Sequence, residues 1–167
     1  MKNIDREKGA LGQKIAARIY RDRGYKVRFP PDPFGWYDLQ ASRSQVEIAV
    51  QVKCTTKRCA SGYPISFDYL ESQLFSCARS GFNEYQLVVV SLPKGFAYVF
   101  SQWKLQSYLN QALDDAKVME HTPAIGLRWS DSVHCFQLNN KELAKFRYIQ
   151  DRENPSQTGD LFEDQDY

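Results

Sequence analysis

The chain has 167 residues, of which 43% are hydrophobic and 25% are charged, and its formal net charge is +2. This length and composition are typical of one compact domain that buries a sizeable core. No run approaches the roughly eighteen apolar residues of a membrane span, and no signal-peptide pattern is present. We therefore exclude a membrane protein and expect a soluble, cytoplasmic chain, associated with the nucleoid if it binds DNA.

The charge is distributed unevenly along the chain. Residues 1–58 carry 13 Lys and Arg against 6 Asp and Glu, residues 59–150 carry 8 of each sign, and residues 151–167 carry 1 against 6. Concentrated positive charge favours a polyanionic partner, because each phosphate contact releases condensed counterions. A solvated basic face is the alternative. We expect a single domain over 1–150 and an acidic, disordered tail over 151–167.

The first elements are a helix and a short strand. Residues 3–23 have apolar side chains at helical spacing, and Gly24 should end that helix. Residues 25–29 alternate in polarity and predict a strand. The sequence "PPDPFG" that follows contains three prolines and a glycine, so it predicts a stiff loop.

A β-hairpin is predicted next, with strands at 36–41 and 46–53 around a turn at 42–45. Alternate residues of the second strand should face the core: Val46, Ile48, Val50 and Val52. The opposite face then carries Glu47, Ala49, Gln51 and Lys53. Antiparallel pairing around this turn places Asp38 opposite residue 49, 50 or 51. The hairpin therefore brings Asp38 close to Gln51 and Lys53.

Two helices and several strands are predicted in the second half. A helix should run from an N-cap at Ser66 to Ser80, followed by strands over 85–91 and 96–101. A helix over 102–119 should bury one stripe, Leu105, Leu109, Leu113 and Ala116. Two edge strands within 124–138 and a helix over 140–149 complete the domain. This order predicts an α/β fold with a mixed central sheet flanked by helices.

The hairpin residues suit phosphodiester hydrolysis assisted by a divalent metal. Mg²⁺ prefers oxygen ligands and is held in proteins by one or two carboxylates together with waters and phosphate oxygens. Asp38 offers a carboxylate, Gln51 an amide oxygen and Val52 a backbone carbonyl. Lys53 could orient the attacking water or offset charge on the phosphate. We expect Mg²⁺ as the cofactor, with Mn²⁺ as a possible substitute.

Asp38, the gap of thirteen residues and Gln51-Val52-Lys53 resemble the core of the PD-(D/E)xK nucleases, some of which carry Gln-x-Lys. The segment "KGALGQKIAARIYRDRGY" resembles the first helix of archaeal Holliday-junction resolvases. The segments "EKGALGQKIAARIY", "FPPDPFGWYDL" and "IAVQVKCTT" resemble more closely the small homing endonucleases encoded in cyanobacterial group I introns. The resemblance is continuous over about residues 3–60.

This resemblance implies a restriction-endonuclease-like core and a catalytic set of Asp38, Gln51, Lys53 and Gln13. It also implies a homodimer or homotetramer that cuts a long, nearly palindromic DNA duplex and so starts intron mobility. Gln13 takes the position of a glutamate that those enzymes use near the metal. It is either an ordinary surface amide or an inactivating substitution, with Glu7 and Glu47 as potential replacements. Asp32 lies outside the hairpin and is not expected to bind metal.

Histidine and cysteine give no sign of a metal site. His121 and His134 have no partners at ligand spacing, which argues against a histidine-metal nuclease or a zinc hydrolase. The four cysteines lack Cys-x-x-Cys spacing and are expected to be free thiols: Cys54, Cys59, Cys77 and Cys135.

The basic residues near the predicted site are candidate DNA contacts. The main candidates are Lys57, Arg58, Lys14, Arg18 and Arg43. We expect a site-specific, double-strand DNA endonuclease of the intron-homing kind. Two alternatives remain open: a structure-specific resolvase of branched DNA, and a DNA-binding protein whose nuclease site is inactive.

Overall fold

The computed structural model describes residues 2–32, 35–121 and 124–153. The helices are α1 (Lys2–Asp22), α2 (Phe67–Ala78), α3 (Gln102–Met119) and α4 (Asn140–Glu153), with a 3₁₀ turn at Trp129–Asp131. The strands are β1 (Lys26–Arg28), β2 (Leu39–Arg43), β3 (Val46–Thr55), β4 (Gly62–Ile65), β5 (Glu84–Ser91), β6 (Phe96–Ser101), β7 (Ile125–Arg128) and β8 (His134–Gln137). Among the helices in these ranges, none is long and apolar enough to cross a membrane.

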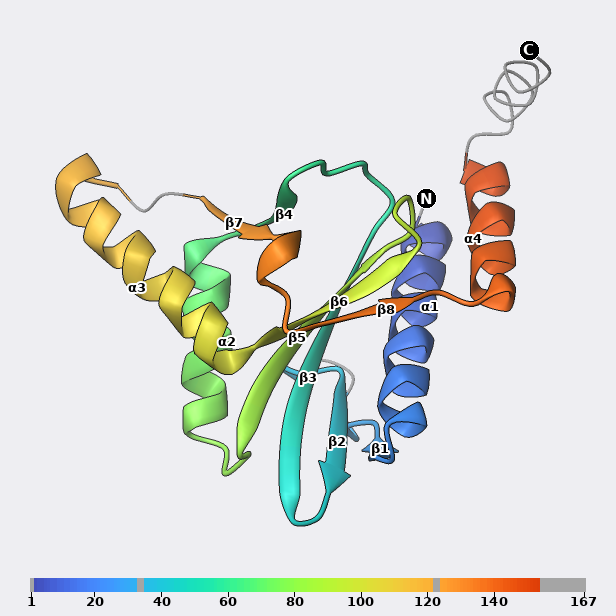
Figure 1. The fold of residues 1–167 in the computed structure, drawn as a ribbon, viewed down its shortest axis with the longest axis horizontal. Coiled ribbons are helices and arrows are strands. Elements are labelled where there is room, and N and C mark those ends of the chain that lie inside the picture. The colour runs from blue at the N-terminus through green and yellow to red at the C-terminus, as the bar shows by residue number, and fades with distance from the viewer. Residues whose placement is uncertain (1, 33–34, 122–123, 154–167) are drawn as a thin grey trace.

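Six strands form a mixed sheet in the order β1-β2-β3-β5-β6-β8 (Figure 1). The central pair, β3 and β5, is parallel, and the other pairs are antiparallel. A separate two-stranded sheet joins β4 to β7. The expected α/β fold with a mixed central sheet and flanking helices is confirmed.

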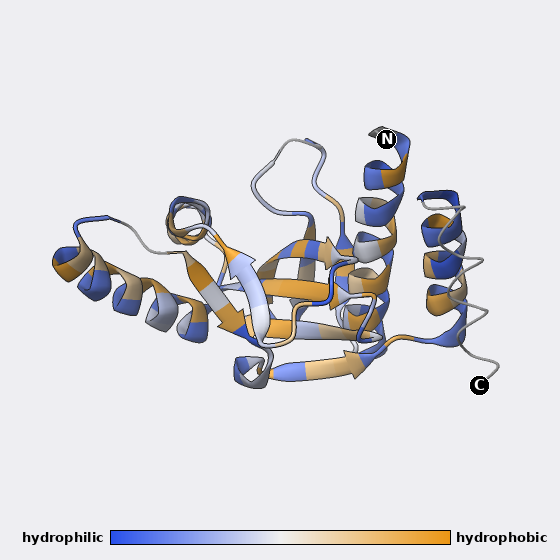
Figure 2. Ribbon diagram, turned by 90° about the horizontal axis from the view of Figure 1, so that it is seen from above, coloured by the Kyte–Doolittle hydropathy of each residue, from blue (hydrophilic) through white to orange (hydrophobic). Residues whose placement is uncertain are grey.

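Helices cover both faces of the sheet. Figure 1 shows α1 and α4 on one side and α2 and α3 on the other, and Figure 2 shows the apolar strands between them. Two buried clusters follow from this arrangement, one that contains α1 residues and Ile149 of α4, and one that contains α2 and α3 residues. Because both faces are covered, β5 can carry the apolar run 87–90, and seven of its eight residues are buried.

The first helix lies very close to the C-terminal end of β3. The predicted core residues of α1, Leu11, Ile15 and Ile19, are all buried. A Cβ atom on Gly12 would lie 3.1 Å from Cβ of Cys54 and 3.4 Å from a methyl of Val52, so glycine allows this approach. Gly24, with φ of 86°, follows the end of α1 as predicted. The close contact brings Gln13 to the hairpin.

The hairpin forms with the expected partners. Ser44 and Gln45 both have positive φ, 50° and 69°, and form a two-residue turn. Leu39 pairs with Val50, and the backbone N–H of Asp38 donates to the carbonyl of Val50 at 2.9 Å. The register therefore falls within the predicted range, and Asp38 lies beside the Val50–Val52 segment of β3.

Several details differ from the sequence-based expectations. Val46 is 42% exposed, because the hairpin tip projects beyond the helices (Figure 1). Leu113 is 41% exposed and Ala112 is buried instead, because the far half of α3 extends past the sheet. The strand β4 was not expected, and β7 pairs with it rather than with the main sheet. Helix α4 continues to Glu153, past the boundary expected at 150, and the tail from 154 onward lies outside the described residues.

Two smaller expectations are confirmed. The hydroxyl of Ser66 caps α2 by accepting a hydrogen bond from the backbone N–H of Tyr69. All the cysteines are free thiols.

Candidate functional site

The site is centred on the carboxylate of Asp38, which is half-buried at the start of β2. One oxygen, Oδ2, accepts the backbone N–H of Val52 at 2.8 Å. The other, Oδ1, accepts the side-chain N–H of Gln13 at 3.2 Å. Two residues far from Asp38 in sequence, one on β3 and one on α1, thus hold its carboxylate in a fixed orientation.

Burial raises the pKa of Asp38 above its ordinary value. The Val52 N–H, the positive charge of Lys53 and the Gln13 amide each offset part of this rise, in that order of size. The buried carboxylate therefore remains poorly compensated by its protein neighbours. An added cation would stabilise its ionised form, which is the electrostatic property required of a metal ligand.

The Lys53 ammonium lies over the ring of Tyr69, with 4.3 Å between Nζ and the ring centroid. Tyr69 is in the first turn of α2, which the Ser66 cap fixes. Burial and, secondly, the charge of Asp38 raise the pKa of the Tyr69 phenol. Asp38, Lys53 and Tyr69 therefore form one electrostatic cluster.

Gln51 and Val52 contribute in different ways. Gln51 is half-buried and shares the face of β3 that carries Lys53. The side chain of Val52 is buried on the α1 face, whereas its backbone N–H points to Asp38. The N–H and C=O of one strand residue point to the same side of the strand. The Val52 carbonyl therefore points to the side of β3 on which β2 and Asp38 lie. The pairing of β2 with β3 ends at Leu39 and Val50, so Val52 lies just beyond it.

The oxygen donors near Asp38 fit Mg²⁺, although only one of them is a carboxylate, the smallest number that usually holds this ion. They are the Asp38 carboxylate, the Val52 carbonyl and the amide oxygens of Gln51 and Gln13. Within the described ranges, no group of three or more His, Cys, Asp or Glu could hold a metal. One carboxylate with carbonyl oxygens still matches the manner in which Mg²⁺ binds jointly to protein and substrate phosphate.

The carboxylates considered as replacements lie elsewhere. Glu7 forms an ion pair with Arg152 of α4, with 2.8 Å between the charged atoms. Glu47 accepts a hydrogen bond from Gln40 near the hairpin tip. Asp32 lies in the loop before β2, where its backbone carbonyl accepts the N–H of Gly35. Neither glutamate therefore supplies the charge that Gln13 lacks.

Two of the basic residues expected to contact DNA form contacts within the chain. Arg18 donates to both carboxylate oxygens of Glu142 on α4, at 2.8 and 2.9 Å, and to Asp22 at 3.1 Å. Arg43 donates to the carbonyl of Arg23 and lies over the ring of Tyr25. Both side chains thus hold together elements of the fold.

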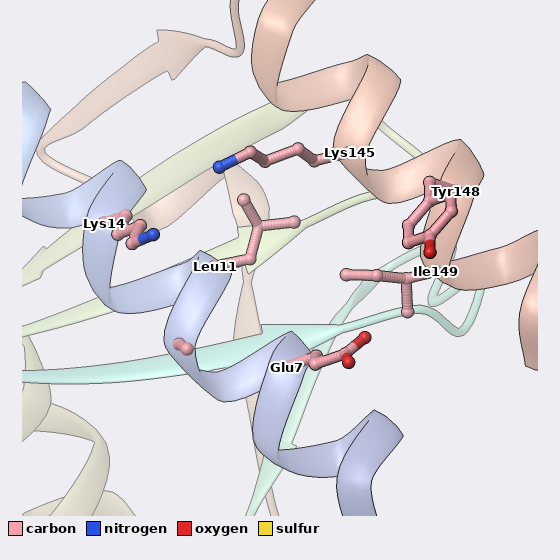
Figure 3. Close-up of a pocket in the computed structure, with 7 residues that line it drawn as sticks. Glu7, Leu11, Lys14, Lys145, Tyr148 and Ile149 are labelled. Atoms are coloured by element: carbon pink, nitrogen blue, oxygen red, sulfur yellow. The ribbon is translucent and has the colours of Figure 1, made fainter.

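The other three basic candidates are exposed. Lys14 lines a pocket between α1 and α4, together with Leu11, Lys145 and Ile149 (Figure 3). Lys57 and Arg58 follow directly after β3, where the backbone N–H of Lys57 donates to the hydroxyl of Thr55. These three side chains remain available to a partner.

The two histidines lie outside the Asp38 cluster. His121 contacts the carbonyl of Met119, and His134 lies 3.2 Å from Arg23 on the edge strand β8. Burial and the nearby Arg23 charge lower the pKa of His134.

Tyr69 is the residue of this cluster that the sequence did not indicate. Its only local signal is its place three residues after the Ser66 cap, and this signal concerns helix formation rather than chemistry. Its contact with Lys53 depends on the packing of α2 against the sheet.

No protein-family model matches the chain, and no curated protein matches it. Among solved structures, the chain is similar to Hjc, a Holliday junction resolvase from the archaeal hyperthermophile Archaeoglobus fulgidus. The sequence identity is 20% and the TM-score is 0.45, and the match covers 57% of this chain and 74% of Hjc. The chain is also similar to the bacterial homing endonuclease I-Ssp6803I. Here the sequence identity is 16% and the TM-score is 0.41, and the match covers 95% of this chain and 96% of the endonuclease. These two structures are of the two kinds of nuclease that segments of its sequence resemble.

Proposed function

We propose that this chain is a DNA endonuclease that depends on a divalent metal. One observation carries the proposal: the Asp38 carboxylate is held by Val52 of β3 and Gln13 of α1, next to Lys53. A half-buried carboxylate, a nearby ammonium group and a backbone carbonyl oxygen are groups that suit metal-assisted phosphodiester hydrolysis.

Each residue has a distinct role in this proposal. Asp38, Gln51 and the Val52 carbonyl would hold Mg²⁺, which when bound supplies charge stabilisation and a more acidic water. Lys53 lies where its positive charge can offset the charge of the phosphate or orient the water. The Val52 N–H and the Gln13 amide orient Asp38.

The more specific part of the proposal is a homing endonuclease of the group I intron kind. It rests on the resemblance of the segments around α1 and the hairpin. A homodimer or homotetramer would place two copies of the site on a long, nearly palindromic duplex, one for each strand. Sedimentation of the chain with and without such a duplex would test the stoichiometry.

A structure-specific resolvase of branched DNA is the first alternative. A four-way junction and a long duplex, offered to the chain separately and in competition with Mg²⁺ present, would separate the two functions. A homing endonuclease cuts the duplex at one position and leaves the junction, whereas a resolvase cuts the junction symmetrically.

A DNA-binding protein with an inactive nuclease site is the second alternative. The Gln13 contact favours this alternative. The Gln13 amide donates to one oxygen of the Asp38 carboxylate, an oxygen that would otherwise be open to a metal ion, and the amide adds no negative charge. Assaying the Gln13→Glu variant beside the unchanged chain distinguishes these cases. Cleavage by the variant alone indicates that Gln13 inactivates the site, and no cleavage by either protein with Mg²⁺ or Mn²⁺ supports the binding protein.

A further inference from the structure

A basic groove lies beyond the end of β3, outside the Asp38 site. It consists of two hollows that adjoin at Arg58 and Pro93, which line both of them. Arg147 of α4 lines the first hollow, and Lys94 of the turn between β5 and β6 lines the second. Three cationic side chains from three segments far apart in sequence therefore converge on one concave surface.

The walls of this groove are connected by backbone hydrogen bonds. The N–H of Leu92 donates to the carbonyl of Thr55 at 3.0 Å and so joins the β5–β6 turn to the end of β3. The N–H of Leu138, just before α4, donates to the carbonyl of Gly95 in the same turn at 2.9 Å. The charged side chains thus project from a fixed frame, which limits the entropy lost when a ligand binds.

The charge of the groove is not neutralised within the described parts of the chain. No carboxylate there forms an ion pair with Arg58 or Arg147, and no acidic residue lines either hollow. The Lys94 ammonium group lies over the face of Trp129, 5.8 Å from the ring centroid, and forms no ion pair with a carboxylate in the described parts of the chain. Arginine guanidinium groups bind phosphate oxygens in a bidentate manner.

We infer that Arg58, Arg147 and Lys94 form a binding groove for the phosphate backbone of duplex DNA. Lys53 and Arg58 are five residues apart along the same segment, so the groove lies on the order of 10–15 Å from the Asp38 site. At about 3.4 Å per base step, this separation corresponds to roughly three or four base pairs. The groove would bind phosphates that flank the cleaved bond, and the inference to this extent rests on the proposed function.

The test is a salt titration of DNA binding without divalent metal, so that no cleavage interferes. Fluorescence anisotropy of a labelled 30-base-pair duplex would compare the unchanged chain with Arg58→Ala, Arg147→Ala and the double variant. Each lost phosphate contact should reduce the slope of log K against log salt concentration by about 0.9, and the double variant should lose about twice as much. Arg58→Lys and Arg147→Lys should keep most of the slope.

Arg79→Ala is the matched control. Arg79 is an exposed arginine at the C-terminal cap of α2. It shortly precedes Glu84 of β5, which pairs with the start of β3, whereas the groove lies beyond the end of β3. Its removal should leave the slope unchanged. The groove assignment would be wrong if the double variant is folded by circular dichroism and keeps the slope of the unchanged chain. It would also be wrong if the unchanged chain has no affinity for DNA at low salt. If the variants change the salt slope as predicted but the unchanged chain does not cleave DNA in Mg²⁺, the nuclease proposal is contradicted and the groove assignment is not.

Discussion

The side-chain amide of Gln13 donates a hydrogen bond of 3.2 Å to the carboxylate of Asp38. This contact joins α1 to the hairpin at the point where the sequence predicted a metal ligand. The donor is the amide nitrogen, so the amide oxygen of Gln13 points away from Asp38. If a metal ion binds Asp38, the Gln13 amide must rotate before its oxygen can serve as a ligand.

We expect Lys53→Ala to reduce the cleavage rate by at least roughly 100-fold, the lower end of the range for a positioned catalytic group. DNA affinity without metal should change less than about threefold, because only one positive charge is lost. Single-turnover cleavage and anisotropy measure the two quantities. Lys117→Ala, which removes an exposed lysine from the end of α3, is the control. Full activity of Lys53→Ala would eliminate Lys53 from the mechanism.

Tyr69 should position Lys53 through its ring. Tyr69→Phe keeps the aromatic face below the ammonium group, so it should retain most of the cleavage rate, whereas Tyr69→Leu should lose about fivefold or more. In a Lys53→Ala background the Leu substitution should have little further effect, since the interaction is already absent. Equal losses for Phe and Leu would instead show that the hydroxyl is the important group.

Asp38 should also affect stability in a pH-dependent manner. Its pKa is raised in the folded chain, so the group favours folding at acid pH and this contribution is lost as the pH rises through the folded value. Asp38→Asn should therefore be at least as stable to urea as the unchanged chain at pH 7. The difference should disappear below about pH 4, where the unfolded carboxyl is also protonated. A variant clearly less stable at pH 7 would contradict the burial effect.

Arg18 should matter for folding rather than for DNA binding. Its two hydrogen bonds to the buried Glu142 connect α1 to α4, so Arg18→Ala should lower the free energy of unfolding by about 1–3 kcal/mol. Urea denaturation measures this value, with the exposed Arg21→Ala as control. The slope of DNA affinity against salt should stay the same in folded Arg18→Ala. A reduced slope would restore Arg18 to the DNA-contact residues.

The sequence predicted the hairpin well because its signal is local. Alternation along β3 predicts the face of Gln51 and Lys53, and a short turn within 42–45 limits the register to a few possibilities. The turn itself lies at Ser44 and Gln45, whose positive φ angles are uncommon for these residue types.

The features that the sequence does not predict are contacts between distant segments. The hydrogen bonds of Arg18 to Glu142 follow from no local pattern, because the two residues are 124 positions apart. No local pattern indicates the contact of Tyr69 with Lys53, because α2 meets the sheet only in the folded chain. The strand β4 contains Gly62 and Pro64, both disfavoured within strands, and the strand forms here through pairing with β7. Local patterns therefore predicted the centre of the site, whereas tertiary packing determines its surroundings.

The most direct test of the account is metal-dependent cleavage by the unchanged chain and by Asp38→Asn. The substrate should be the duplex that binds most tightly in a selection from a random pool, so that target choice does not limit the result. We predict a double-strand cut at one position in Mg²⁺, none in EDTA, and none with Asp38→Asn although it binds the duplex with similar affinity. Equal cleavage by Asp38→Asn, or no cleavage by the unchanged chain in either Mg²⁺ or Mn²⁺, would contradict the proposed function.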